Sequence, residues 1–231
     1  MSEAKKIFIS GASKGIGLAI AQHFYAQGFT VAICARNPAS LEAAKETMPN
    51  LRVYACDVSQ REAVQSLVET LTQDHGHFDV LINNAGIFLG GNLTDGDEDV
   101  YAQVMRTNVD SAYYLTRGLA PAMKTRKSGA IINICSVASI RAYTGGGAYC
   151  MSKHAMLGFG KVLRHEMMPF GIRVMNVLPG AVLTDSWASS DLPKSRFMPV
   201  EDIAQAVWDS YKLSERTVVE EVILRPFLGD I

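Results

Sequence analysis

Lys6-Ile7-Phe8-Ile9-Ser10-Gly11-Ala12-Ser13-Lys14-Gly15-Ile16-Gly17 is the stretch that decides the fold of this chain. Its apolar start predicts a buried strand at 6–10. The glycines that follow predict a tight turn, because glycine adopts backbone conformations that other residues avoid. The residues behind the turn predict a helix at 15–27. A strand, a glycine turn and a helix in direct succession are typical of the first unit of a parallel sheet.

The same alternation of strand and helix continues along all 231 residues. Further strands are predicted at 29–35, 51–56, 79–83, 129–135, 172–178 and 218–224. Helices are predicted at 38–47, 60–74, 98–124, 148–168 and 200–213, with a break in the long fourth helix near Asn108. Short, almost wholly apolar strands separated by helices indicate a doubly wound parallel α/β sheet (a Rossmann fold), with about seven strands and helices on both faces. Because no linker or repeat interrupts the pattern, we expect a single domain over 1–231.

Composition and charge exclude several classes of protein. The formal net charge of -1 gives no reason to expect binding to nucleic acid or to an anionic membrane surface. No apolar stretch reaches the length of a membrane span, and the N-terminal residues lack the apolar core of a signal peptide. We therefore expect a cytoplasmic protein. The cysteines and histidines show no metal-ligand spacing; we expect Cys34, Cys56 and Cys135 to be small buried side chains and Cys150 to be partly exposed.

Polar and glycine residues follow five of the predicted strands directly. They are the glycine turn at 11–17, Asp57, the sequence Asn83-Asn84-Ala85-Gly86, Ser136, and Pro179-Gly180. In doubly wound sheets, ligands bind beyond the carboxyl ends of the strands. These residues therefore predict a ligand site at that edge of the sheet.

The glycine turn is suited to bind a diphosphate, since the backbone can approach it closely and a helix N-terminus adds unpaired N–H groups. Taken alone, the spacing G-x-x-x-G-x-G is a weak signal, but its place in the first strand-helix unit favours a dinucleotide. An acidic residue after the second strand would bind the ribose of NAD, whereas this chain has Cys34-Ala35-Arg36-Asn37. Arg36 and Lys14 offer two cations to a 2′-phosphate. We expect NADP(H), the alternative being that both are solvated surface charges.

Tyr149 and Lys153 lie four residues apart in a predicted helix, so the phenol and the ammonium project from one face. A phenol has an ordinary pKa of about 10, and a nearby cation lowers it toward neutral pH. Ser136, thirteen residues before Tyr149, adds a hydroxyl donor at the end of a strand. These three groups are suited to protonate a carbonyl oxygen while a cofactor delivers hydride.

Taken in order, these motifs resemble those of the short-chain dehydrogenase/reductase family, and the resemblance covers essentially the whole chain. Ser10 stands where threonine is more usual in the family. The matching residues are Gly11, Gly15, Ile16 and Gly17 in the cofactor turn, the N-N-A-G sequence at 83–86, Asn108, Ser136, Tyr149-x-x-x-Lys153 and the loop at 179–184.

The resemblance implies a role for each of four catalytic residues. Ser136 would donate a hydrogen bond to the substrate carbonyl, and Tyr149 would be the general acid in reduction and the base in oxidation. Lys153 would bind the nicotinamide ribose and lower the pKa of Tyr149. Asn108 would hold a water molecule that links Lys153 to solvent; alternatively, its side chain satisfies backbone groups at a helix break.

The resemblance also implies which residues bind the cofactor. Asp57 would face the adenine, with Val58 contacting it through the backbone, unless Asp57 is only a turn or helix-cap residue. The loop at 84–86 would support the adenosine ribose, and Val182 and Thr184 would hold the carboxamide. The full predicted set is Gly11, Ser13, Lys14, Gly15, Ile16, Gly17, Arg36, Asp57, Val58, Asn84, Ala85, Gly86, Tyr149, Lys153, Pro179, Gly180, Val182 and Thr184.

Residues around 185–199 correspond to the substrate lid of the family, and this lid is short. Its short length suggests an open, permissive pocket. Trp187, Phe197 and Met198 either line an apolar wall or pack against the protein. Further candidates for the pocket wall lie between Ser136 and Tyr149: Ile140, Tyr143 and Thr144.

The function we expect is NADPH-dependent reduction of a carbonyl compound of small size to an alcohol. A sepiapterin- or diketone-reductase-like enzyme and a 3-oxoacyl-acyl-carrier-protein reductase are both open, with Lys194 and Arg196 offering weak support for an acidic carrier. A non-catalytic NADP(H)-binding regulatory protein would lack the tyrosine or the lysine. An NAD-dependent alcohol oxidiser is disfavoured by Arg36. The resemblance also implies a homodimer or homotetramer.

Overall fold

The computed structural model describes residues 4–188 and 190–231. Four residues lie outside the described ranges: Met1, Ser2 and Glu3 at the N-terminus, where no signal peptide was expected, and Ser189 in the predicted lid. Among the described residues, no helix is long and apolar enough to pass through a membrane.

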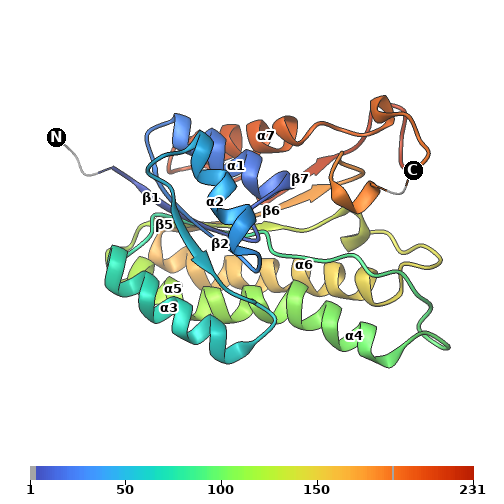
Figure 1. Ribbon diagram of the computed structural model, residues 1–231. Helices are drawn as coiled ribbons and strands as arrows, with labels where there is room; N and C mark the ends of the chain where they lie inside the picture. Colours follow the sequence, from blue (N-terminus) through green and yellow to red (C-terminus); the bar gives the residue numbers. More distant parts are fainter. Residues whose placement is uncertain (1–3, 189) are drawn as a thin grey trace.

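One parallel sheet contains the strands in the order β3-β2-β1-β4-β5-β6-β7, so the predicted Rossmann fold is confirmed (Figure 1). Its order reverses between β1 and β4, which places the switch point directly beside the glycine turn. The strands are β1 (Lys6–Ser10), β2 (Thr30–Ala35), β3 (Arg52–Ala55), β4 (Val80–Asn83), β5 (Gly129–Ile134), β6 (Ile172–Pro179) and β7 (Glu221–Leu224).

Helices cover both faces of this sheet (Figure 1). One face carries α1 (Gly15–Ala26), α2 (Pro38–Thr47) and α7 (Val200–Lys212). The other face carries α3 (Arg61–His75), α4 (Glu98–Met105), α5 (Ser111–Arg126) and α6 (Gly147–Met167).

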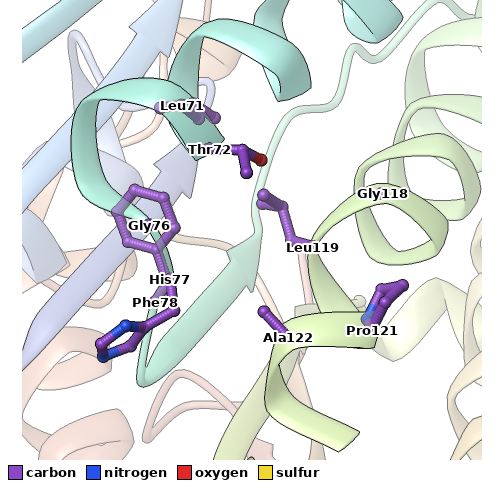
Figure 2. Close-up of a pocket in the computed structure, with 9 residues that line it drawn as sticks. All are labelled: Leu71, Thr72, Gly76, His77, Phe78, Gly118, Leu119, Pro121 and Ala122. Atoms are coloured by element: carbon purple, nitrogen blue, oxygen red, sulfur yellow. The ribbon is translucent and has the colours of Figure 1, made fainter. Parts of the chain in front are cut away.

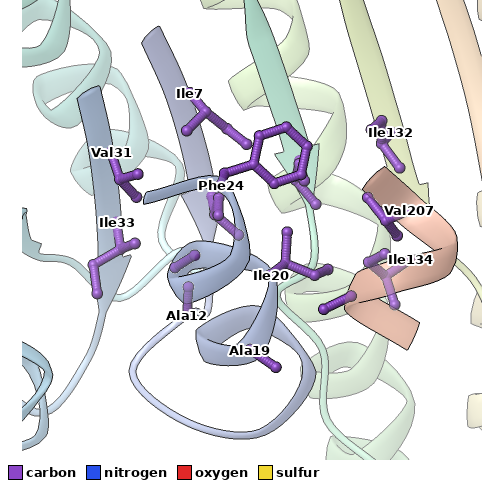
Figure 3. Packing of buried hydrophobic residues seen from close by; sticks show 14 of the residues in the cluster. Ile7, Ala12, Ala19, Ile20, Phe24, Val31, Ile33, Ile132, Ile134 and Val207 are labelled. Carbon is purple, nitrogen blue, oxygen red and sulfur yellow. The ribbon is translucent and has the colours of Figure 1, made fainter. Parts of the chain in front are cut away.

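Alternate residues of each strand fill the cores on the two faces. In β1, Ile7 and Ile9 point toward α1 and α7, whereas Phe8 points toward α3 and α5. Figure 3 shows the first core, where Phe24 and Ile20 of α1 pack onto Ile7 and its neighbours. Because both faces of the inner strands are buried, these strands carry apolar side chains at almost every position, whereas the edge strands β3 and β7 are partly exposed.

The predicted element boundaries agree with the structure to within two residues, except in the last strand. This strand begins at Glu221, opposite Asn176, rather than at Val218. Thr217 still belongs to a turn, in which its N–H donates to the carbonyl of Ser214 at 2.9 Å. The predicted break near Asn108 is confirmed as a π-helical turn over Arg106–Asp110 between α4 and α5.

A cavity of about 160 Å³ lies between the end of α3 and the middle of α5 (Figure 2). Phe78 lines it just before β4 begins, so the cavity is at the amino edge of the sheet. The predicted site residues belong to the opposite, carboxyl edge. The cavity is lined by Leu71, Thr72, Gly76, His77, Phe78, Gly118, Leu119, Pro121 and Ala122.

Candidate active site

The glycine turn and the loop after β4 interlock through Ser10 and Asn84. The Ser10 hydroxyl accepts the N–H groups of Asn84 and Ala85, each at 3.1 Å. The Asn84 amide donates back to the carbonyls of Ser10 at 2.9 Å and Gly11 at 2.8 Å. Gly11 has a φ of +65°, and a Cβ there would lie 2.7 Å from Ala85 Cα. Only glycine fits this position, and the contact with Ala85 therefore explains why residue 11 is a glycine.

Beyond the turn, α1 begins with its N–H groups directed at the same edge, next to the loop after β6. Gly15 has a φ of +59°, and a Cβ there would lie 3.4 Å from Thr184 Cγ2. A glycine cradle at a helix N-terminus fits a diphosphate, since the open backbone and the helix dipole both favour an anion. The geometry therefore suits the dinucleotide that the sequence predicts.

Two exposed cations flank this cradle as the sequence predicts. Arg36 follows β2, and no acidic side chain occupies the positions beside it in Cys34-Ala35-Arg36-Asn37. Lys14 precedes α1 and forms an exposed ion pair with Asp185 at the start of the lid. Arg36 is thus open to a 2′-phosphate, whereas Lys14 would have to leave Asp185 to reach one.

Lys153 is buried, with only 6% of its surface exposed, and its ammonium is fixed at the end of β5. Its Nζ donates to the carbonyl of Ile134 at 2.9 Å and lies 5.8 Å from the centre of the Tyr149 ring. A Cβ on Gly86 would lie 3.6 Å from the same Nζ. One face of α6 therefore brings Tyr149 and Lys153 to the loop after β4, as their spacing predicts.

Asn108 connects the π-helical turn to two neighbouring segments. Its Oδ1 accepts the N–H of Ile87 at 2.7 Å, and its amide donates to the Ile87 carbonyl at 3.0 Å. The amide also donates to the Ser152 hydroxyl at 3.0 Å. These contacts are the backbone role that the sequence left open as an alternative. With both amide hydrogens engaged, the side chain could hold a water molecule only through Oδ1.

Ser136 caps the 3₁₀ turn Val137–Ser139 that follows β5. Its hydroxyl accepts the Ala138 N–H at 3.1 Å, and its own N–H donates to the Ser139 hydroxyl at 3.2 Å. Because the Ser136 oxygen acts as an acceptor in the cap, its hydrogen is left to donate outward.

Two aromatic side chains lie near Tyr149, and one of them was missed by sequence reasoning. Phe88 presents its ring edgewise to Tyr149, with centroids 5.0 Å apart and an interplanar angle of 81°. Burial raises the pKa of Tyr143, and the nearby Tyr149 and Cys150 raise it further, which keeps Tyr143 protonated. The only available signal for Phe88 is its place two residues after the sequence Asn83-Asn84-Ala85-Gly86.

The cysteines include one correction. Burial raises the pKa of Cys34 to about 12 and those of Cys56 and Cys135 to about 11, so all three are neutral thiols as expected. Cys150, expected to be partly exposed, is instead buried. The first turn of α6 directs its sulfur inward, against Gly146 and the ring of Tyr143.

The loop after β6 has buried and exposed parts. Val182 packs in the core with Met198, and the two are joined as a short parallel bridge. Phe197 is also buried, 5.2 Å from the ring of Trp187. Phe197 and Met198 are therefore packing residues rather than parts of an exposed wall, and Val182 has only its backbone free for a ligand. In the lid, 185–187 and 194–196 form single 3₁₀ turns.

The sequence profile described as short chain dehydrogenase matches residues 5–194. This chain belongs to the short-chain dehydrogenase family. It is 36% identical over 238 residues to sepiapterin reductase of Chlorobaculum tepidum, with 97% of each chain covered. It is 31% identical over 216 residues to a 3-oxoacyl-[acyl-carrier-protein] reductase of Haemophilus influenzae, with 89% of each covered. A crystal structure of a metagenomic short-chain oxidoreductase in complex with NADP is similar at a TM-score of 0.85 and 31% identity, covering 97% of this chain and 98% of that one.

In this short-chain dehydrogenase, Asp57 occupies a turn. Its Oδ1 accepts the N–H and the hydroxyl of Ser59, at 3.1 and 2.8 Å. This is the turn role that the sequence left open, and the second carboxylate oxygen is still free for a ligand. Val58 is buried, so its backbone is the part that a cofactor could contact.

A buried ladder of asparagines, which sequence reasoning missed, lies behind the site of this short-chain dehydrogenase. The Asn83 amide donates to Asn133 Oδ1 at 2.9 Å, and the Asn133 amide donates to Asn176 Oδ1 at 3.0 Å. The three residues are in register on β4, β5 and β6. A Cβ on Gly160 of α6 would overlap Asn176, so α6 lies directly on the ladder. The ladder thus fixes the helix that carries Tyr149.

Proposed function

We propose that this protein uses NADPH to reduce the carbonyl group of a small molecule to an alcohol, with Tyr149 as the proton donor. The observation that carries this proposal is the placement of Tyr149 and buried Lys153 on one face of α6, beside Ser136 and the glycine cradle. A hydroxyl donor, a phenol and a fixed ammonium meet where a dinucleotide would lie.

NADP(H) is the proposed cofactor because of the charges around the cradle. Arg36 is exposed after β2, where an acidic residue would be needed for NAD. The relative crystallised in complex with NADP supports the same choice. The proposed contacts are those predicted from the sequence, with backbone contact at Val58 and Val182.

The chain's own residues supply binding and proton transfer, while NADPH, when bound, supplies the hydride. Ser136 donates its free hydroxyl hydrogen to the substrate carbonyl oxygen. Tyr149 donates a hydrogen bond to the same oxygen and then gives it the proton. One N–H of Lys153 is held by Ile134, and the others are free for a ribose and for the phenol. Asn108 keeps the loop at Ile87 in place.

A compact substrate is favoured by the short lid around 185–199 and by the likeness to sepiapterin reductase. We propose that the chain is a single domain over 1–231, with cytoplasmic location and assembly as a homodimer or homotetramer. The competing substrate is a 3-oxoacyl thioester on an acidic carrier protein, which Lys194 and Arg196 on one 3₁₀ turn could attract.

The test is NADPH oxidation measured with ketones, diketones, a pterin carbonyl compound, quinones and a 3-oxoacyl thioester. We expect turnover of small carbonyl compounds, with NADPH preferred over NADH. Tyr149→Phe should lower kcat by about 10²–10⁴, the range for a lost general acid, and leave NADPH binding intact. Tyr113→Phe, which removes an exposed phenol on α5, is the matched control.

Three results would contradict the proposal. Full activity of Tyr149→Phe would exclude the phenol as proton donor. Equal or tighter binding of NADH would overturn the choice of cofactor and revive the NAD-dependent alcohol oxidiser. Tight NADPH binding without turnover of any carbonyl compound would favour the non-catalytic regulatory protein.

A further inference from the structure

The segment after β7 runs back along the carboxyl edge, on the same side as the loops after β4, β5 and β6 (Figure 1). Here we call residues 225–230 the C-terminal strap. Just before the strap, the carbonyl of Leu224 at the end of β7 accepts the Gly180 N–H of the loop after β6 at 2.7 Å. A Cβ on Gly180 would lie 3.1 Å from Pro226 Cδ, so the strap and this loop are in close contact.

The end of the strap turns toward a different loop. The Gly229 N–H donates to the Pro226 carbonyl at 2.9 Å, which closes a four-residue turn, and Gly229 has a φ of +88°. The turn directs Asp230 back onto the protein. Asp230 Oδ2 there accepts Arg141 Nη1 at 2.7 Å and also pairs with Arg225 of the strap.

Asp230 is the most sheltered member of this group. Its side chain is 22% exposed, compared with 62% for Arg141 and 39% for Arg225. A partly buried carboxylate that two guanidinium groups share is screened less than an ordinary surface pair. Asp230 therefore acts as a fixed point to which Arg141 is attached.

Arg141 belongs to residues 140–145, which we call the substrate loop. The loop lies between Ser136 and Tyr149, and its Ile140 and Tyr143 are 45% and 46% exposed. Both neighbours of the loop have anchors of their own: Ser136 through its cap and Tyr149 through α6. The exposed middle of the loop gains an additional attachment through Arg141.

We propose that Asp230 is a positioning residue for substrate binding. Through Arg141 and Gly180, the strap links the substrate loop to the loop after β6, and so keeps the exposed Tyr143 of this loop near Tyr149. This inference rests on the proposed function, since it concerns the wall of that same site. It assigns the strap to substrate affinity and leaves proton transfer to Ser136 and Tyr149.

The test compares Asp230→Asn and Arg141→Gln with the wild-type protein. From the strength of a partly exposed ion pair, we expect KM for the carbonyl substrate to rise about fivefold in either variant. The value of kcat and the Kd for NADPH should stay at the wild-type level. The double variant should resemble the single variants, since each of them breaks the same contact. Asp230→Glu should restore part of the affinity.

Amide hydrogen exchange supplies a readout that needs no turnover. Exchange at 140–145 should be faster in Asp230→Asn and unchanged in Asp209→Asn, a matched control on the exposed face of α7. Failure of the wild-type protein to reduce any carbonyl compound would contradict the proposed function, while the exchange result would still decide the role of the strap. Unchanged KM and unchanged exchange would overturn the inference, as would a fall in kcat with KM constant.

Discussion

The two halves of the candidate site are built differently. On the cofactor side, the pair Ser10-Gly11 and the pair Asn84-Ala85 interlock through four hydrogen bonds and a contact that only glycine permits. On the substrate side, large apolar side chains project into solvent: Phe88, Ile140 and Tyr143 are 46%, 45% and 46% exposed. Substrate-side residues are held by few contacts, and some of these come from distant parts of the chain.

The fold therefore restricts which residues can occupy the cofactor side, whereas it permits many different side chains on the substrate side. A glycine turn whose backbone is held by hydrogen bonds and by close contact with Ala85 leaves little room for its residues to change. An exposed wall on loops can change its side chains at little cost to stability, since surface substitutions are usually nearly neutral. The comparison teaches that the candidate cofactor side is tied directly to the ends of β1 and β4, whereas the candidate substrate side is carried on exposed loops.

The largest expected effect comes from Gly11→Ala. The added methyl would overlap Ala85 Cα, and alanine is strained at a φ of +65°. From the costs of a left-handed alanine and of overpacking, we expect a loss of about 2–5 kcal/mol in the free energy of unfolding. NADPH binding should be lost as well. Urea unfolding and NADPH fluorescence measure the two effects.

Gly28→Ala is the matched control for this experiment. Gly28 also has a positive φ of +83°, but nothing lies within 4 Å of its Cβ position. We expect only the backbone term of about 1–2 kcal/mol, with NADPH binding retained. Equal losses in the two variants would show that the close contact with Ala85 contributes nothing to the rigidity of the cofactor side.

Arg36→Leu should have the next largest effect, and on cofactor choice rather than on stability. Loss of a charge-assisted contact to a 2′-phosphate should weaken NADPH binding by about 10- to 100-fold. NADH binding should not change. The control is Arg52→Leu, which removes an exposed arginine at the start of β3, at the amino edge of the sheet. This variant should leave the dissociation constants for NADPH and NADH unchanged. A parallel loss of NADH affinity in Arg36→Leu would mean that Arg36 supports the turn and not the phosphate.

Several elements around the candidate site were predictable from sequence because their determinants are local. The glycines follow directly after β1, the tyrosine and the lysine share one helical face, and the strand pattern of buried apolar residues predicts the sheet that aligns them. The break near Asn108 could be located as well, although its π-helical form could not.

Contacts that join residues far apart in the chain were not predictable on either side; the hydrogen bond between Ser10 and Asn84, for example, spans 74 positions. Lys14 and Asp185 are separated by 171 positions, and Arg141 and Asp230 by 89. No periodicity links such pairs. The pairing of Asn133 with Asn176 depends on the order of the strands in the sheet, and the sequence did not predict that order. The sequence predicted Cys150 to be partly exposed. This prediction was wrong, because the burial of Cys150 depends on tertiary packing around Gly146.

Trp187→Ala should have a smaller effect, confined to the substrate side. Its ring packs on Phe197 at 5.2 Å, and an aromatic pair contributes about 0.5–1.5 kcal/mol. We expect KM for the carbonyl substrate to rise by up to about tenfold, while the midpoint of thermal unfolding moves little. The control is Trp208→Ala, which removes a partly buried ring packed edgewise on Phe24 and on the core, and which should lower the unfolding midpoint more than Trp187→Ala. A large loss of stability in Trp187→Ala would show that the lid is as firmly packed as the cofactor side.

The smallest effect concerns Lys14 and Asp185, the ion pair that joins the two sides. If Lys14 turns to the 2′-phosphate, its pair with Asp185 must break first, so Asp185 competes with the cofactor. Asp185→Asn should therefore tighten NADPH binding by about twofold, the size expected from an exposed pair, and leave NADH binding unchanged. The gain should fade at high salt, where exposed charges are screened. Asp191→Asn, also in the lid, is the control; weaker NADPH binding in Asp185→Asn would show instead that the pair holds the turn in its binding form.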